Sequence, residues 1–457
     1  SGVNTMLVGG LGKGGRGYFA LDLTGLTPAL ADRPASENAL AARVMWEYPD
    51  AGTLATEIED LGYSYSRVAV VKSNDTTNAP WVVIFGNGYN SVNGHAVLFI
   101  LDPTPGATNR VLRRIDTGVG NCNGLSTPVA IDVNDDAKVD YVYAGDLKGN
   151  LWKFDLSDPV YTNWGVAYNE GGNPKPLFQA PDQPITTKPA VMRHCKKGGY
   201  IVTFGTGRYL GLEDLTDSSV QAVYGIWDYG DDADDGEYVG EFDGATITGS
   251  NLPTTVSLLQ QIVVDESTVN GMVLRTLGAG QPDWQSTTLD GGSCGDNYGT
   301  DDCDPNYIPS VDAAPDPVRH AGWFFNLPES GERVVTDVLL RAGKLTVISY
   351  VTEGSTCGLA GHSWVMVMDP CTGGRLTEAY FDVNDDGTID YQDLIDIGEP
   401  DNAPPTGIKL DGKLAAPTYL ISGMIENIYL PDNTGKLNKK IGAAPKQGMA
   451  HWRVLRK

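Results

Sequence analysis

Five short β-prone segments of this chain end in the same way, with an aspartate after a run of hydrophobic residues. These closing aspartates are Asp22, Asp102, Asp155, Asp228 and Asp369. Before each comes another β-rich run and a glycine-rich connection, as in WVVIFGNGYNSVNGHAVLFILD. Two apolar runs joined by such a turn are typical of a β-hairpin. A recurring hairpin therefore restricts the fold more than any other feature of the sequence.

A third strand precedes several of the hairpins, as in SYSRVAVVK, STPVAIDV and TTKPAVMRH. A strand followed by a hairpin and a break, repeated along the chain, predicts an all-β, modified β-propeller, for which we expect seven blades. The aspartates are unevenly spaced, so we expect long inserted loops, the longest over about residues 241–321, and a few short helices, one around 36–46. A pair of β-sandwiches is the alternative architecture that the same strands allow.

Length and charge narrow the class of protein. The 457 residues suffice for two or three average domains, but no linker forces a boundary, and we expect a single domain over 1–457. The chain begins at Ser1 without an initiator Met or signal peptide, so we interpret it as a piece that lacks the N-terminal part of a longer protein.

No apolar run approaches the roughly 20 residues that span a bilayer, so no membrane insertion is expected. A net charge of −25 argues against nucleic acid and anionic membranes as partners.

Six cysteines are present, none of them in a CxxC pair, which argues against a zinc ribbon or a thioredoxin-like redox site. An even number in loops rich in Gly and Asp indicates disulfides formed in an oxidising compartment. Other pairings and buried free thiols stay open, but nearness in the sequence favours one set. The expected pairs are Cys294–Cys303, Cys357–Cys371 and Cys122–Cys195.

Two stretches of the sequence repeat a pattern of oxygen-bearing residues that suits a hard cation. The first, DVNDDAKVD, covers residues 132–140. At alternate positions of such a tight loop, side-chain oxygens and the carbonyl of position 7 curl around one ion. Carboxylate and amide oxygens in a flexible loop favour Ca²⁺ over Mg²⁺, which demands near-octahedral geometry. The predicted ligands are Asp132, Asn134, Asp136, the backbone carbonyl of Lys138, and Asp140.

The second stretch, DVNDDGTIDYQD over residues 382–393, matches the EF-hand pattern more completely. Gly387 occupies position 6, where the sharp turn favours glycine, and Asp393 occupies position 12, ahead of a segment that we expect to form a short helix. We therefore predict one or two calcium ions in this protein. The ligands predicted for the second stretch are Asp382, Asn384, Asp386, the backbone carbonyl of Thr388, Asp390 and Asp393.

The first stretch departs from the EF-hand pattern in two places. Ala137 stands at position 6, which costs about 1 kcal/mol if the backbone there is left-handed, and Tyr143 at position 12 offers no carboxylate. Because it lies between two β-prone runs, we expect a strand–loop–strand site closed by Asp140. The carboxylates of each stretch repel one another in the absence of a cation, which couples the metal to the local fold. The alternative for each stretch is an acidic, solvated turn without metal.

Motifs for catalysis are missing from the sequence. Gly10, Gly12 and Gly15 fit a dinucleotide-binding string, but a strand follows them where a helix is required, which favours a glycine-rich hairpin. No two of the five histidines stand at metal-ligand spacing, and neither HExxH nor GxSxG occurs. We therefore expect no enzyme, and no catalytic or cofactor-binding residues.

The stretch STPVAIDVNDDAKVDYVYAGDLKGNLWKFDLS closely resembles the calcium-loop blade of the PilY family of type IV pilus biogenesis factors and pilus-tip adhesins. Two further segments also resemble sequences of that family, GGLGKGGRGYFALDL near the start of the chain and MAHWRVLR near its end. The resemblance implies a modified β-propeller from the C-terminal end of a longer secreted protein. It also implies that the family's calcium ligands fall on Asp132, Asn134, Asp136, Lys138 and Asp140.

The same resemblance implies a function. The family's domain promotes type IV pilus biogenesis, with calcium binding opposing pilus retraction, and the full proteins act in twitching motility and surface adhesion. It implies an extracytoplasmic location, at the pilus (fimbrium) tip, cell surface, periplasm or outer membrane of a bacterium, with pilin, pilus-assembly proteins and host-cell or surface receptors as partners. Two alternatives stay open. One is a quinoprotein-like or glycan-active propeller enzyme, although the adjacent cysteines of quinoproteins are missing, and the other is a carbohydrate- or matrix-binding propeller unrelated to pili.

Overall fold

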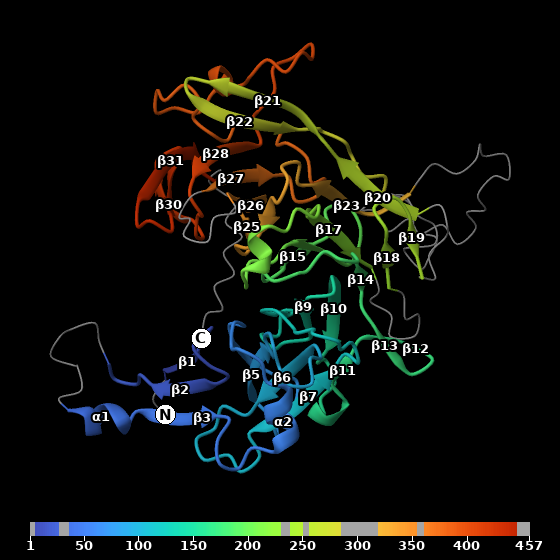
Figure 1. The fold of residues 1–457 in the computed structure, drawn as a ribbon, viewed down its shortest axis with the longest axis vertical. Helices are drawn as coiled ribbons and strands as arrows, with labels where there is room; N and C mark the ends of the chain where they lie inside the picture. The colour runs from blue at the N-terminus through green and yellow to red at the C-terminus, as the bar shows by residue number, and fades with distance from the viewer. Residues whose placement is uncertain are drawn as a thin grey trace. The chain divides into compact units, whose positions relative to one another are not determined.

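The computed structural model describes residues 5–26, 36–229, 238–249, 256–284, 319–353 and 361–445. The chain divides into two compact units, unit 1 (Ser1–Pro176) and unit 2 (Leu177–Lys457). Each unit is built mainly from antiparallel β-strands, with few and short helices (Figure 1). In these ranges, no helix is both long and apolar enough to cross a membrane.

Unit 1 contains three antiparallel sheets whose strands follow one another along the chain. The first sheet joins β1 (Met6–Gly10), β2 (Tyr18–Asp22) and β3 (Val44–Tyr48). The second joins β4 (Ala69–Lys72), β5 (Trp81–Gly86), β6 (Val97–Leu101) and β7 (Val111–Asp116). The third joins β8 (Val129–Ile131), β9 (Tyr141–Gly145), β10 (Asn150–Asp155) and β11 (Gly165–Val166). A separate hairpin follows, made of β12 (Tyr168–Glu170) and β13 (Asn173–Lys175).

Both faces of the second sheet are buried, which explains why its central strands are almost continuously apolar. On β5, Val83 and Phe85 pack with residues of the first sheet, including Trp46. Val82 and Ile84 point to the other face and pack with residues of the third sheet. A strand that is covered on both faces loses the usual alternation of apolar and polar residues. The three sheets of unit 1 are thus stacked face to face, as the blades of a propeller are.

The predicted hairpin strands are confirmed. Asp22, Asp155 and Asp228 end strands, and Asp102 and Asp369 directly follow strands. The glycine-rich segment near the start is also a hairpin, because β1 and β2 pair antiparallel with Gly10 opposite Tyr18. The five hairpins therefore form where the sequence indicates them, while the number of blades stays a prediction.

The helices of unit 1 are shorter than expected. The helix predicted around 36–46 is confirmed only for α1 (Glu37–Ala41), and Trp46 lies on β3, where it pairs with Ala20 of β2. Strand pairing therefore overrides helix formation after Ala41. The other helices are α2 (Ala55–Asp60) and the 3-10 turn η2 (Tyr161–Asn163).

Unit 2 contains larger sheets and two 3-10 turns, η3 (Glu213–Leu215) and η4 (Tyr391–Asp393). One sheet has the order β15 (Ala190–Arg193), β16 (Tyr200–Gly205), β17 (Ala222–Asp228), β23 (Arg319–Asn326) and β20 (Val256–Gln261). Another has the order β21 (Val263–Val269), β22 (Met272–Leu277), β28 (Gly407–Asp411), β27 (Gly361–Met368), β26 (Lys344–Thr352) and β24 (Arg333–Val334), with β25 (Leu339–Arg341) on β26. The last sheet joins β29 (Thr418–Ser422), β30 (Ile425–Pro431) and β31 (Leu437–Ala443). The remaining strands are β14 (Phe178–Gln179), β18 (Gly240–Phe242) and β19 (Ile247–Thr248).

Part of the region predicted as an insertion completes these sheets. β20 pairs in parallel with β23, and the long hairpin of β21 and β22 joins the neighbouring sheet through β28 (Figure 1). Residues 250–255 and 285–318 of the predicted insertion lie outside the described residues. The Gly- and Asp-rich composition of this region concealed its strands.

A hydrophobic cluster joins the last sheet to the sheet of β26, β27 and β28. It contains Val365 and Val367 of β27 and Ile428 and Leu430 of β30. The connection between β27 and β28 also contributes to it, with Phe381 among its buried side chains. This connection is therefore part of the core of unit 2.

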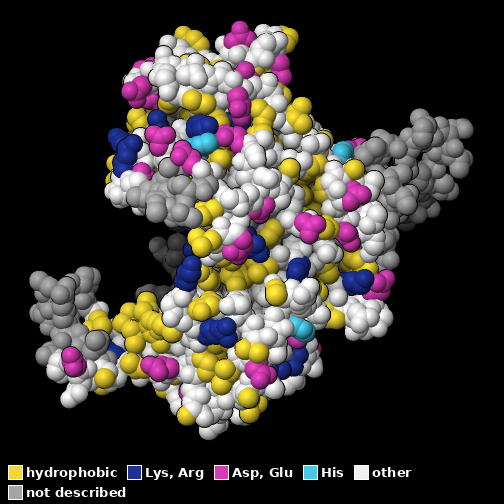
Figure 2. All heavy atoms as spheres, in the orientation of Figure 1, with side chains coloured by type: hydrophobic (Ala, Val, Ile, Leu, Met, Phe, Trp, Pro, Cys, Tyr) yellow, Lys and Arg dark blue, Asp and Glu magenta, His cyan; other side chains and the backbone are white. Residues whose placement is uncertain are grey.

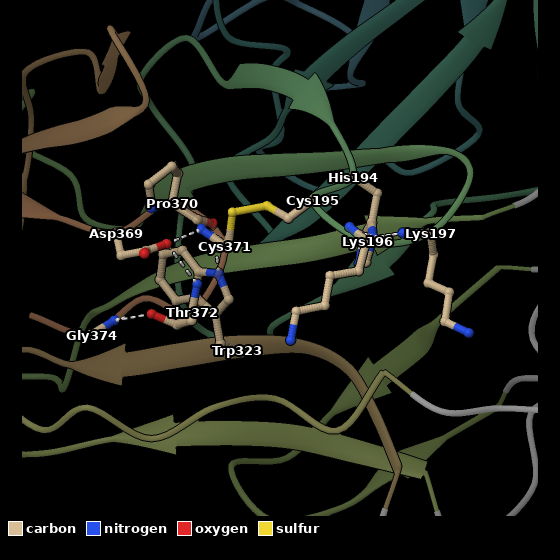
Figure 3. Close-up of a disulfide and its surroundings, with 10 residues drawn as sticks. All are labelled: His194, Cys195, Lys196, Lys197, Trp323, Asp369, Pro370, Cys371, Thr372 and Gly374. Carbon is tan, nitrogen blue, oxygen red and sulfur yellow. Dashed lines mark hydrogen bonds between the residues drawn. A yellow bond between two sulfur atoms is a disulfide. The ribbon is translucent and has the colours of Figure 1, made fainter. Parts of the chain in front are cut away.

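A disulfide joins Cys195 to Cys371 within unit 2, with their Cα atoms 6.0 Å apart. Figure 3 shows Cys195 next to His194, after β15, and Cys371 in the turn that follows β27. In that turn, Asp369 Oδ1 accepts a hydrogen bond from the Cys371 N–H at 2.7 Å. The prediction of a disulfide is thus confirmed, but not its partners.

The expected pairs Cys122–Cys195 and Cys357–Cys371 are wrong, because Cys195 and Cys371 bond to each other. These two residues are 176 positions apart, and only the packing of two sheets of unit 2 brings them together. Nearness in the sequence was the wrong criterion for choosing the partners. Cys122 is exposed, and the pair Cys294–Cys303 lies outside the described residues.

The surface charge agrees with the overall balance of the chain, whose net charge is −25. On the face drawn in Figure 2, Lys and Arg side chains are scattered among acidic ones. For the part of the chain whose side chains are coloured there, this face has no continuous basic patch.

Candidate metal centre

Loop 1, residues 132–140, connects β8 to β9 and so has the strand–loop–strand setting that the sequence predicts. Its backbone curls because Asp135 and Ala137 are left-handed, with φ of 66° and 65°. Asp132 accepts three backbone hydrogen bonds, at Oδ1 from Asp135 (2.6 Å) and Asp136 (3.3 Å), and at Oδ2 from Ala137 (2.7 Å). Ala137 therefore carries the cost of about 1 kcal/mol expected for a left-handed residue with a Cβ atom.

Asp140 closes loop 1. It is 2% exposed, and its Oδ2 accepts a hydrogen bond from the Val133 N–H at 2.9 Å. Its Oδ1 accepts a bond of 3.0 Å from the side-chain amide of Asn74, which also donates to the Val139 carbonyl at 2.9 Å. Sequence reasoning missed Asn74, because it follows β4 of the neighbouring sheet and only the stacking of sheets brings it to the loop.

Lys138 contributes more to loop 1 than the carbonyl that the sequence pattern requires. Its ammonium nitrogen lies 2.7 Å from Oδ2 of Asp136. This hydrogen bond, together with one from the Lys138 N–H to Oδ1, lowers the pKa of Asp136. A metal ion that used Asp136 as a ligand would therefore have to displace the Lys138 ammonium.

Loop 2, residues 382–393, repeats the backbone of loop 1 position by position. Asp385 and Gly387 are left-handed, with φ of 61° and 83°. The Gly387 N–H donates to Oδ2 of Asp382 at 2.9 Å, as the Ala137 N–H donates to position 1 of loop 1. Two loops that share the sequence DVNDD thus share their local fold.

Position 5 of loop 2 differs from its counterpart in loop 1. The hydroxyl and the backbone N–H of Thr388 both donate to Oδ1 of Asp386 and lower the pKa of that carboxyl. The Asn384 amide donates to Oδ2 at 3.0 Å. The sequence from 382 to 393 contains no Lys or Arg, so no ammonium from within the loop competes with a metal ion there.

Asp393 closes loop 2. It is fully buried, and it accepts hydrogen bonds from the N–H groups of Val383 (2.7 Å) and Asp390 (2.9 Å). Asp390 caps the 3-10 turn η4, which ends at Asp393. The short helix predicted after Asp393 is wrong, because Leu394 is extended and the next residue forms a bridge with Ala403. Pairing with that second segment holds the chain extended.

The carboxylate of Asp382 is only half satisfied. Asp382 is 7% exposed, and its Oδ1 has no hydrogen-bond partner among the residues that the structure describes. Burying an oxygen acceptor without a partner is unfavourable by about 1–3 kcal/mol. In loop 1, the equivalent oxygen of Asp132 accepts from a backbone N–H. Loop 2 therefore has an open acceptor at position 1, whereas loop 1 does not.

The residues of both loops fit a hard cation through their chemistry. Each loop offers carboxylate, amide and carbonyl oxygens at alternate positions, and neither offers the nitrogen or sulfur ligands that zinc prefers. Within the described ranges, however, no three His, Cys, Asp or Glu side chains gather as they do around a bound metal. The loop carboxylates accept backbone N–H bonds, so metal binding would require several of them to turn. The predicted ligand sets stay predictions.

A buried ionic network in unit 2 was not predicted. Arg275 is fully buried and makes a two-pronged ion pair with Glu332, with distances of 2.8 and 3.2 Å. Its guanidinium also lies 4.0 Å from the centre of the Trp364 ring, and Ser349 donates to Glu332. Glu266 also pairs with the Arg275 Nε at 2.8 Å, so carboxylates surround the guanidinium, which explains how unit 2 keeps an arginine in its core. No local sequence signal identifies it, since its members come from segments far apart in the sequence.

The stacked antiparallel sheets, the inserted loops and the few short helices define a protein of the β-propeller class. Residues 2–270 match the family model of the PilY1 beta-propeller domain, which covers more than half of the chain. This chain belongs to the PilY1 beta-propeller family.

Sequence relatives agree with this assignment. The type IV pilus biogenesis factor PilY1 of Pseudomonas aeruginosa is 31% identical over 417 residues, which cover 85% of this chain and 30% of that protein. A PilY1 homolog from Xylella fastidiosa is 32% identical over 388 residues, covering 81% of this chain and 22% of the homolog. The chain therefore spans less than a third of the length of these curated relatives.

A solved structure supports the fold. The crystal structure of the P. aeruginosa PilY1 C-terminal domain matches with a TM-score of 0.69 and 26% sequence identity. The match covers 97% of this chain and 81% of that domain. The likeness therefore extends over both units, and the resemblance inferred from short motifs is confirmed.

Proposed function

We propose that this chain acts in type IV pilus biogenesis and that loop 1 is its calcium-dependent element. The ion is held by Asp132, Asn134, Asp136, Asp140 and the carbonyl of Lys138. The observation that carries the proposal is the curl of loop 1, with left-handed residues at positions 4 and 6, in a member of a pilus biogenesis family. In calcium loops, a backbone that curls in this way lets oxygens at alternate positions turn toward one ion.

The relatives support a role at the pilus, since they are named as pilus biogenesis factors. Neither the quinoprotein-like or glycan-active enzyme nor the propeller unrelated to pili finds support among them. The disulfide of unit 2 adds support for an extracytoplasmic location, where such bonds persist. In the proposed setting, the protein resides at the pilus tip, the cell surface, the periplasm or the outer membrane.

The proposed partners are pilin or pilus-assembly proteins, with host-cell or surface receptors as adhesion targets. Calcium occupancy of loop 1 opposes pilus retraction and thereby regulates extension, twitching motility and adhesion. The physical basis is the displacement of Lys138 from Asp136, which changes the charge and shape of an exposed loop. Such a local change can alter the affinity of a neighbouring surface for a partner.

The test compares Asp136→Ala with Asp135→Asn, a matched control that also removes one loop charge but leaves the predicted ligands intact. The protein is first freed of metal with a chelator and then titrated with calcium. Asp136→Ala should bind one calcium ion fewer than the wild type, whereas Asp135→Asn should bind the same number. In a bacterium that produces the full-length protein, Asp136→Ala should reduce the number of surface pili, and inactivation of retraction should restore them. Unchanged calcium stoichiometry in Asp136→Ala would disprove the ligand assignment. Normal piliation without calcium binding would disprove the regulatory role.

A further inference from the structure

Loop 2 contains an acceptor that the fold itself leaves unsatisfied. The side chain of Asp382 is more than nine-tenths buried, and its Oδ2 accepts from Gly387 across the loop at 2.9 Å, so the carboxylate faces the interior of the loop. Its Oδ1 has no hydrogen-bond partner within the described part of the chain. A buried carboxylate oxygen without a donor is rare in folded proteins, and such an oxygen commonly binds an ion or a water molecule.

The neighbouring donors show which ion suits this oxygen. The loop supplies further oxygens from Asn384, Asp386, Asp390 and the carbonyl of Thr388, all of them hard ligands. Five carboxylates lie between 382 and 393 without a basic residue among them, so the local charge favours a divalent cation. A flexible loop of oxygens selects Ca²⁺ over the smaller Mg²⁺.

The contacts of loop 2 show what such an ion would hold together. Residues 380–382 run antiparallel to β31, with the Asp382 N–H donating to the Ile441 carbonyl at 3.2 Å and the Ala443 N–H donating to the Tyr380 carbonyl at 2.8 Å. The first predicted ligand is therefore attached by its backbone to the edge of the last sheet.

A second element of unit 2 also reaches loop 2. Asn270, in the turn between β21 and β22, donates from its side chain to the Val383 carbonyl at 3.2 Å. Val383 is buried in the hydrophobic cluster that the last sheet shares with β27. Loop 2 thus lies at the junction of the last sheet, the long hairpin and the connection between β27 and β28 (Figure 1).

We infer that loop 2 is a second calcium site, separate from loop 1, and that its ion fastens the last sheet and the β21–β22 hairpin to the core of unit 2. Asp382 supplies the buried ligand, and the exposed carboxylate of Asp386 completes the site from the solvent side. Because the loop contains no competing ammonium, it binds Ca²⁺ more tightly than loop 1. The inference does not depend on loop 1 or on the proposed role at the pilus.

Calcium titration of four proteins tests the site: wild type, Asp382→Asn, Asp385→Asn and the loop 1 variant Asp136→Ala. Asp382→Asn keeps the shape of the side chain, whereas Asp385→Asn removes the same charge from position 4, which supplies no predicted ligand. We expect the affinity of the tighter site to fall at least about a hundredfold in Asp382→Asn. It should stay nearly unchanged in Asp385→Asn and Asp136→Ala. If the tighter site survives in Asp382→Asn, the inference is overturned. If the tighter site is lost in Asp136→Ala, that site lies in loop 1, and the inference is again overturned.

Because Asp382 is buried, its variant is first checked for folding in chelator by circular dichroism. If Asp382→Asn does not fold, Asp386→Ala replaces it, since Asp386 is exposed and lies outside the core. We expect the same loss of the tighter site in Asp386→Ala. A tight site that survives in this variant also overturns the inference, whereas failure of Asp136→Ala to lose the weaker site contradicts only the proposed function.

Hydrogen exchange tests the fastening. With Ca²⁺ at ten times the dissociation constant or more, exchange in residues 437–443 and 269–272 should slow by about tenfold or more in the wild type and Asp385→Asn. No slowing is expected in Asp382→Asn or Asp386→Ala. Equal slowing in these variants, or none in a wild type that binds calcium at loop 2, would show that the ion does not hold these elements.

Discussion

Loop 1 and loop 2 begin with the same five residues and turn at the same two left-handed positions, yet different positions close them. In loop 1, Asp140 at position 9 accepts a hydrogen bond from the N–H of position 2. In loop 2, Asp393 at position 12 accepts the equivalent bond. Loop 1 continues into β9, whereas loop 2 passes through a 3-10 turn before it closes. A buried carboxylate at the mouth of the loop is thus the shared requirement, and the flanking structure decides which residue supplies it.

The loops also differ in how completely the protein satisfies them. In loop 1, an ammonium pairs with Asp136, and both oxygens of Asp132 accept backbone hydrogen bonds. In loop 2, no basic residue is present, and Oδ1 of Asp382 is buried without a partner among the residues described. The comparison therefore predicts that loop 1 stays intact without metal, whereas loop 2 needs an ion to complete it.

The largest expected effect comes from removing the closing carboxylates. Asp140→Ala and Asp393→Ala should each lower the free energy of unfolding by about 2–4 kcal/mol in chelator, because each substitution leaves buried donors without an acceptor. Chemical denaturation in EGTA measures this change. Similar losses in both variants would show that the two aspartates have the same structural role despite their different positions.

The control for this experiment is Asp401→Ala, which removes an exposed aspartate from unit 2 and should change the stability by less than about 0.5 kcal/mol. A closing variant as stable as this control would contradict the role of that carboxylate. If only one of the two closing variants is destabilised, the equivalence of Asp140 and Asp393 is lost.

The second effect concerns position 7, where the residue of each loop can be replaced by that of the other. Lys138→Thr should raise the calcium affinity of loop 1 roughly tenfold, because it removes both a competing cation and a local repulsion of the ion. Thr388→Lys should weaken loop 2 by a similar factor, again roughly tenfold. Calcium titration at physiological ionic strength measures both changes.

A matched control for the exchange is Lys148→Thr, the same substitution in unit 1 outside loop 1. It should leave the calcium affinity of loop 1 within about twofold, since salt screens charges at a distance. If neither exchange variant changes the affinity, the Lys138–Asp136 ion pair does not explain the difference between the loops.

Much of the fold was predictable because strand signals are local. The run WVVIFG predicts a buried strand from its own composition, and β5 is that strand. The strands of residues 256–277 were missed although polar residues alternate with apolar ones in β21, because the surrounding region is rich in Gly and Asp and was interpreted as an insertion. The partner of Cys195 was also unpredictable, since the packing of sheets decides it.

The candidate site was predictable to the extent that it depends on residues close together in the sequence. The alternation of oxygens is visible in nine residues, and the structure meets the condition on which the cost of Ala137 depends, since this residue is left-handed. Asn74 and the Lys138–Asp136 pair were not predicted. Neither was the open oxygen of Asp382. Each depends on which donors surround a side chain in three dimensions, and the linear pattern does not contain that information.

The smallest effect concerns position 6, where loop 1 has Ala137 and loop 2 has Gly387, both left-handed. Ala137→Gly should stabilise the metal-free protein by about 0.5–1 kcal/mol, because glycine adopts this conformation without steric cost, although its greater freedom in the unfolded chain reduces the gain. Gly387→Ala should destabilise loop 2 by a similar amount, about 0.5–1 kcal/mol. A Cβ atom at 387 would meet no other atom within 4 Å, so only the backbone conformation opposes it.

Denaturation in EGTA and again in Ca²⁺ separates this backbone effect from metal binding. If the backbones of the two loops are equivalent, the two substitutions should shift the stability in opposite directions by the same amount in EGTA. Calcium should enlarge the shift for Gly387→Ala, because loop 2 needs its curled backbone to assemble the ligands, and the strained form binds less well. A shift of the same sign in both variants would show that position 6 is not equivalent in the two loops, and the comparison would then rest on their sequences alone.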